Sequence, residues 1–200
     1  MLHSTDHRSR GGRGRVVGPA LVLALAAGLA SAPLVAASEA GPGYLAVKSF
    51  SAKPQFWGLV RLTATTNGRI PYRADAFISS NTIVGVAWAD LDTGTALVAT
   101  IHPAFPQDSK WPPGIWHLHT VQLAGGATAP NDFCLVAVPT SPLAPVWIFG
   151  STMTVWLPAS KLPDAGSGPI SVRDIDAAVG FTVHSGDAGC ATGLGVRIRT

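Results

Sequence analysis

The stretch IVGVAWADLDTGTALVATIH, residues 83–102, decides the fold class of this chain. It contains two apolar runs, Ile83–Ala89 and Thr95–His102, on either side of the turn sequence Asp90–Gly94. Gly94 can adopt the positive φ that a tight turn between antiparallel strands requires. The stretch therefore predicts a β-hairpin.

Similar short apolar stretches, separated by turn residues, continue in both directions from this hairpin. Val, Thr and Ile are frequent, whereas glutamate, a strong helix former, occurs only at Glu39. Such spacing of short strands is typical of sandwiches and barrels. We therefore predict an all-β fold with very little helix, an antiparallel β-sandwich of the immunoglobulin-like or Greek-key type. Tryptophans inside predicted strands are expected in its core: Trp57, Trp88, Trp116, Trp147 and Trp156.

The first 37 residues have the features of a secretory signal peptide. Four arginines between Arg8 and Arg15 precede an apolar run, and Val35–Ala37 offers a cleavage site with small residues. We expect residues 1–37 to be a cleaved leader. The alternative is a retained anchor, because Val16–Ala37 approaches the length of a membrane span.

The remainder of the chain is predicted to be one domain. Residues 38–53 form either a flexible arm or an edge strand, and residues 54–200 form the sandwich, because no repeat, long linker or second boundary is visible. We expect a secreted or periplasmic protein with no membrane span after the leader is removed.

The charge of the chain lies mostly in the leader. The whole sequence has 14 Lys and Arg against 11 Asp and Glu, a net charge of +3. Four arginines and Asp6 give residues 1–37 the same net charge, so the remainder is neutral. A neutral domain lacks the basic surface that nucleic acids require, and no nucleic-acid partner is expected.

The chain contains two cysteines, Cys134 and Cys190. In an exported protein such a pair predicts a disulfide, and two reduced, buried thiols are the alternative. A bridge across this separation would stabilise the fold by roughly 3–4 kcal/mol.

Four histidines follow the leader, and they are the best candidates for binding a ligand. His117 and His119 alternate on a predicted strand, so their side chains project from the same face. His184 ends a C-terminal strand, and His102 ends the second strand of the hairpin. Imidazole ligands suit copper or zinc. We predict a metal site formed by His117, His119 and His184, with His102 as its least secure member.

Two carboxylates are expected to support these imidazoles through hydrogen bonds. Asp187 is close to His184 in the sequence, and Asp132 lies on the loop that follows the His-x-His strand. An alternative role exists for the His-x-His pair. Because Val121 and Leu123 share their face, the two rings are then interior side chains bonded to backbone carbonyls.

Two segments resemble the chordin-type (CHRD) domain. Trp116–His119 is similar to that family's Ala-His-Ile-His-like tetrapeptide, and Phe181–Ser185 with Val196–Ile198 is similar to its C-terminal strands. More remotely, the His-x-His pair resembles the copper ligands of copper/zinc superoxide dismutase. The resemblance implies a β-sandwich and gives His117, His119 and His184 as the matching histidines.

The leading functional prediction is an exported β-sandwich binding protein rather than an enzyme, with copper or zinc at the histidines. The sequence has no GxSxG motif of a nucleophilic serine. One alternative is a copper/zinc metalloenzyme of dismutase-like type. Another is a structural or adhesive surface domain without metal, which contacts a protein or surface-matrix partner.

Overall fold

The hairpin predicted at residues 83–102 is present in the computed structural model, which describes residues 42–73, 83–102, 114–138, 142–163 and 170–200. Strands β3 (Ile83–Asp90) and β4 (Thr95–Ile101) pair antiparallel, with Trp88 opposite Leu97. Gly94 has a φ of 69°, as the turn requires. The Asp90 carboxylate accepts hydrogen bonds from the backbone N–H groups of Asp92 and Thr93 and so stabilises the turn.

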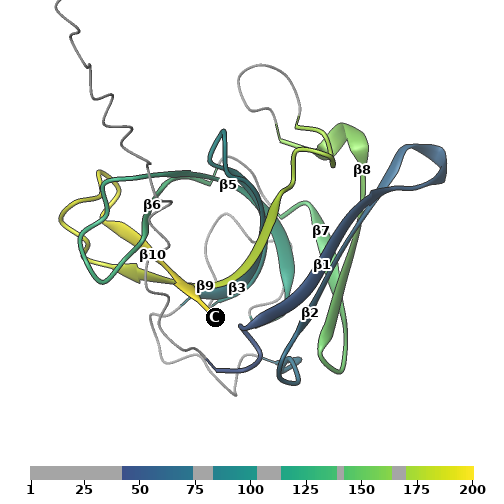
Figure 1. The fold of residues 1–200 in the computed structure, drawn as a ribbon, viewed down its shortest axis with the longest axis horizontal. Coiled ribbons are helices and arrows are strands. Elements are labelled where there is room, and N and C mark those ends of the chain that lie inside the picture. Colours follow the sequence, from purple (N-terminus) through teal and green to yellow (C-terminus); the bar gives the residue numbers. More distant parts are fainter. Residues whose placement is uncertain (1–41, 74–82, 103–113, 139–141, 164–169) are drawn as a thin grey trace, which may run out of the picture. The chain divides into compact units, whose positions relative to one another are not determined.

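Six antiparallel strands, β3 and β4 among them, close into a barrel (Figure 1). Strand β6 closes the ring because it pairs with β5 on one side and with β10 on the other. Closure leaves none of these six strands with an unpaired edge along its whole length. The other four barrel strands are β5 (His117–Ala124), β6 (Phe133–Ala137), β9 (Ala177–Ser185) and β10 (Leu194–Arg199).

A second group of strands, called here the outer sheet, packs beside the barrel in the order β1, β2, β8, β7 (Figure 1). It joins the barrel where β7 pairs with His117 and Leu118 of β5. Strand β1 lies at the sheet edge and includes part of the segment expected to be an arm or edge strand. The four strands are β1 (Val47–Pro54), β2 (Leu59–Thr66), β7 (Ala144–Phe149) and β8 (Thr152–Pro158).

The predicted all-β, antiparallel class is confirmed. Within the described residues the helical elements are two short 3-10 turns, Phe56–Gly58 and Ala159–Lys161. The architecture is a closed six-stranded barrel with four further strands beside it, where the sequence predicted a sandwich. Strands β7 and β8 form a second hairpin, which turns at Gly150 with a φ of 61°.

Alternating side chains of β3 and β4 divide between two cores. Val84, Val86 and Trp88 point from β3 toward the outer sheet, whereas Ala87 and Ala89 point into the barrel. The same alternation on β4 explains why both strands are buried on both faces. The β3–β4 hairpin is therefore the common wall of the two cores.

The predicted disulfide is confirmed. Cys134 of β6 and Cys190, in the loop before β10, are joined with a Cα–Cα distance of 5.2 Å. The Thr192 hydroxyl adds a hydrogen bond from the same loop to the Leu135 carbonyl. Both links secure the region in which β6 closes the barrel.

The predicted leader, residues 1–37, lies outside the described residues. In the part of the chain that the structure describes, no helix has the length and apolar character needed to cross a membrane.

Candidate metal centre

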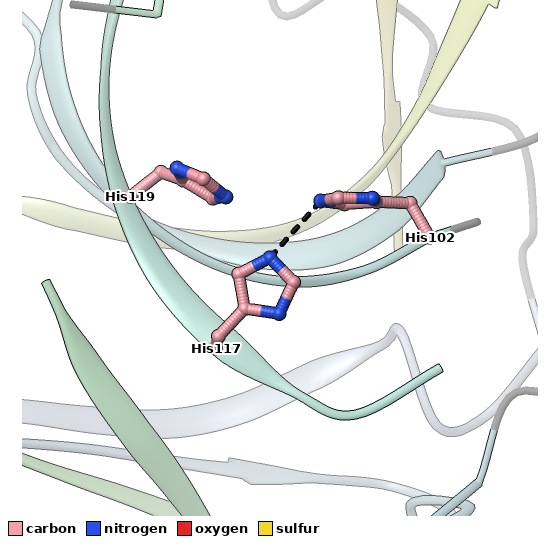
Figure 2. A group of neighbouring side chains, drawn as sticks. All are labelled: His102, His117 and His119. Carbon is pink, nitrogen blue, oxygen red and sulfur yellow. Dashed lines mark hydrogen bonds between the residues drawn. The ribbon is translucent and has the colours of Figure 1, made fainter. Parts of the chain in front are cut away.

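Three buried imidazoles converge on the inner side of the barrel wall (Figure 2). One ring nitrogen from each of His102, His117 and His119 lies within 4.8 Å of the other two. The ring centroid of His117 lies 4.7 Å from that of His102 and 4.8 Å from that of His119. All three side chains are at most 5% exposed, so solvent contributes little to their environment.

The pairing of β4 with β5 brings the three rings together. Val98 lies opposite His119, and Thr100 lies opposite His117. His102 follows two residues after Thr100, and side chains two residues apart on an extended chain share a face. His102 therefore extends the row of inward-facing side chains on β4 toward the two histidines of β5.

The hydrogen bonds of His117 indicate its tautomer. Its Nδ1 lies 2.7 Å from the Ile115 carbonyl oxygen, which can only accept a hydrogen bond, so Nδ1 carries the proton. In the neutral ring Nε2 then has the lone pair, and it faces Nε2 of His102 at 3.0 Å. This is the arrangement found in metal-binding histidines, whose other nitrogen commonly donates to a carbonyl or carboxylate.

His117 also fits the alternative that the sequence left open, because an interior histidine bonded to a backbone carbonyl makes this same contact. The other ring nitrogen of His117, Nε2, distinguishes a metal ligand from an interior histidine. Nε2 faces Nε2 of His102 at 3.0 Å, and a ring nitrogen of each of the three histidines lies within 4.8 Å of the others. Three imidazoles that share one small volume can accept a cation in place of the proton between them.

His184 does not belong to this cluster. Phe181 and Val183 of β9 point into the barrel core, so His184 and Thr182 lie on the opposite face of the strand. There the His184 Nε2 and the Thr182 hydroxyl are hydrogen-bonded at 2.8 Å. The structure thus brings His102, the least secure candidate, together with His117 and His119, and it places His184 apart from them.

The two predicted supporting carboxylates stabilise loops instead. Asp187 accepts hydrogen bonds from Thr128, Asn131 and Gly189. Asp132 accepts one from the backbone N–H of Ile198. Both carboxylates thus connect the β5–β6 loop with the β9–β10 region. Within the described residues, the three histidines alone form the candidate metal-binding group.

The free energy of unfolding of the Asp187→Asn variant is expected to decrease less with falling pH than that of the wild-type protein. Hydrogen bonds, first that from the Thr128 hydroxyl, lower the pKa of Asp187 from 3.8 to about 2. A lowered pKa gives stability that is full above the ordinary value and is lost as the pH falls toward 2. The asparagine side chain does not ionise and lacks this pH-dependent stabilisation. The stability of the variant should therefore change less between about pH 4 and pH 2.

Urea unfolding of both proteins across this pH range measures the difference. Asp92→Asn provides a control, because that carboxylate is exposed in the β3–β4 turn. Identical acid dependence of the wild-type and Asp187→Asn proteins would contradict the assigned role of Asp187.

The chemistry of the cluster is that of a neutral, nitrogen-only ligand set. Imidazole nitrogens suit copper, zinc, nickel and iron, and copper has the highest affinity among the divalent first-row metals. Three histidines also leave one position of a four-coordinate ion open for another ligand. The alternation of the His-x-His pair was visible in the sequence. The approach of His102 to this pair was not, because it depends on the pairing of β4 with β5.

Comparison of the chain with known proteins finds no matching family model, no matching curated protein and no matching solved structure. The likeness to CHRD domains accordingly stays a prediction from the sequence.

Proposed function

We propose that this protein is an exported binding protein that holds one copper or zinc ion through His102, His117 and His119. The observation that carries the proposal is the approach of the three buried ring nitrogens within 4.8 Å. The confirmed disulfide is compatible with an oxidising compartment and supports export. The basic and apolar leader sequence supports it as well.

Burial favours neutral imidazoles in this cluster, which is the form that binds metals. A protonated imidazole is costly to bury, and three of them would repel one another. The Ile115 carbonyl fixes the His117 ring so that its Nε2 already faces the cluster. A preset ligand orientation lowers the entropy lost on binding, which supports a built metal site.

Metal titration of the purified protein tests the proposal. We expect one zinc or copper ion per chain, and we expect His119→Ala to weaken binding by more than the 10–100-fold loss typical of an outer hydrogen-bond partner. His184→Ala is the matched control and should bind like wild type, because that ring lies on the other face of β9. Binding must also decrease from neutral pH to about pH 5, because protons compete for imidazole.

Two results would overturn the metal proposal. One is stoichiometric metal that persists in a variant lacking both His117 and His119. The other is the absence of saturable binding by zinc and copper in the wild-type protein, measured by calorimetry and elemental analysis.

The surface-domain hypothesis has one observation in its favour, which is a set of exposed aromatic side chains on the outer sheet. Phe56 and Trp57, between β1 and β2, are 86% and 97% exposed. Trp147 and Phe149 of β7 are also largely exposed, and Trp156 of β8 is 42% exposed. The expectation that Trp57, Trp147 and Trp156 lie in the core is therefore wrong, whereas Trp88 and Trp116 are buried. Under this hypothesis Trp57→Ser removes binding to a partner or matrix, and chelators leave that binding unchanged.

A further inference from the structure

The barrel contains a cavity of about 690 Å³. Two of the three clustered histidines, His102 and His119, contribute to its wall, and most of the remaining wall is aliphatic or aromatic. Sites for small organic molecules in proteins have volumes of about 300–1,000 Å³ and similarly apolar linings. The cavity is therefore large enough for a ligand much bigger than a metal ion.

Small side chains at inward-facing positions create this space. Ala87 and Ala89 of β3 and Ala177 of β9 line the cavity with methyl groups only. Strand pairing places Ala89 next to Ala177, so the small residues form one continuous region of the wall. At Gly85 the Phe181 ring fills part of the barrel interior, because it packs against the glycine. The available space lies beside the three alanines and continues past Phe181 to Ile83 and His102.

The cavity reaches the end of the barrel at which β3 turns into β4. Its lining includes Leu91, which is 62% exposed, and Gly94 of the same turn. Ala124 and Gly125, at the end of β5, complete this rim. His102 directly follows β4 and lies seven residues after Thr95, roughly 23 Å along an extended chain from this end. A molecule entering near Leu91 would therefore meet His102 and His119 at the opposite end of the cavity.

Two polar groups elsewhere in the wall, the Asp90 carboxylate and the Thr100 hydroxyl, are engaged by the protein itself. The Asp90 carboxylate accepts two backbone N–H groups of its own turn. The Thr100 hydroxyl donates to the Val84 carbonyl at 3.0 Å. Neither group is positioned to select a polar ligand. At the end of the cavity lined by His102 and His119, the polar groups are therefore the imidazoles and any ion that they hold.

We propose that the barrel interior binds a small, mostly apolar organic molecule that places one polar atom at the histidine cluster. Occupation of the cavity by the apolar part follows from its volume and lining and does not require a metal. The position of the polar atom rests on the proposed function, because the open coordination position of the ion would receive it.

Binding of the fluorescent apolar probe N-phenyl-1-naphthylamine to the metal-free, full-length protein tests the first part. We expect saturable binding of one probe per chain. The double variant Ala87→Leu/Ala89→Leu should weaken it at least about tenfold, because leucines fill the cavity. Ala159→Leu is the matched control: the same substitution at an exposed position outside the barrel should leave probe binding unchanged.

Probe binding that is absent in the wild type, or equal in the double variant, overturns the cavity proposal. Equal binding would assign the probe to exposed aromatic side chains such as Trp57. Zinc titration of the double variant checks that its barrel is intact, because the substitutions leave the three histidines unchanged. This second readout separates failure of the cavity proposal from failure of the metal proposal.

Competition between octanohydroxamic acid and octanamide tests the position of the polar atom. The two compounds share a chain, but the hydroxamic acid ligates metals more strongly. With zinc bound, we expect it to displace the probe at least about tenfold better than the amide, through the open coordination position. The preference should vanish in His119→Ala. Equal displacement by both compounds in the zinc-loaded wild type overturns this part of the proposal.

Discussion

The Trp88→Ala variant is expected to lose about 3–5 kcal/mol of its free energy of unfolding. Trp88 is 0% exposed and lies where the barrel wall meets the outer sheet. Its Nε1–H donates to the Thr63 carbonyl of β2 at 3.1 Å, which links the two layers directly. Alanine removes both the indole volume and this hydrogen bond, and strands on both sides cannot collapse to fill the space.

Urea unfolding followed by far-ultraviolet circular dichroism measures this loss. Trp147→Ala is the matched control, because Trp147 is 67% exposed on the outer sheet. Surface substitutions of this kind usually change stability by no more than about 0.5 kcal/mol. Losses of similar size in both variants would contradict the packing of two layers around Trp88.

The double variant Cys134→Ser/Cys190→Ser is expected to lose about 4 kcal/mol, because its unfolded chain is no longer restrained by a 56-residue link. For a domain of this size the loss corresponds to a decrease in Tm of roughly 8–16 °C. The effect should be large because the bond connects β6, which closes the barrel, to the loop before β10.

Thermal unfolding under non-reducing conditions measures the decrease, and the wild-type protein with a reducing agent is its control. Both samples should shift to the same lower Tm. A shift in the serine variant without one in the reduced wild type would assign the effect to the substitutions rather than to the lost bond.

Local patterns in the sequence were sufficient to predict the β3–β4 hairpin. The Asp90–Gly94 turn and its flanking apolar runs predicted β3 and β4 correctly, because both depend on neighbouring residues. Closure of the barrel depends instead on the pairing of β6 with β10, far apart in the chain. Periodicity within one segment holds no information about such a partner.

The candidate site was predictable in part for the same reason. Alternation alone placed His117 and His119 on one face of β5. Choosing between His102 and His184 required the strand order, which puts β4 beside β5 and β9 beside β3. The exposed Trp57 and Trp147 were not predictable either, because aromatic residues within strands serve cores and exposed faces alike.

The central claim is that one ion binds between His102, His117 and His119. Anomalous X-ray scattering from crystals of the zinc-loaded protein tests it most directly. We predict one strong anomalous peak inside the barrel, about 2.0–2.1 Å from a nitrogen of each of the three rings. A peak beside His184, or no peak inside the barrel at full zinc loading, would contradict the claim.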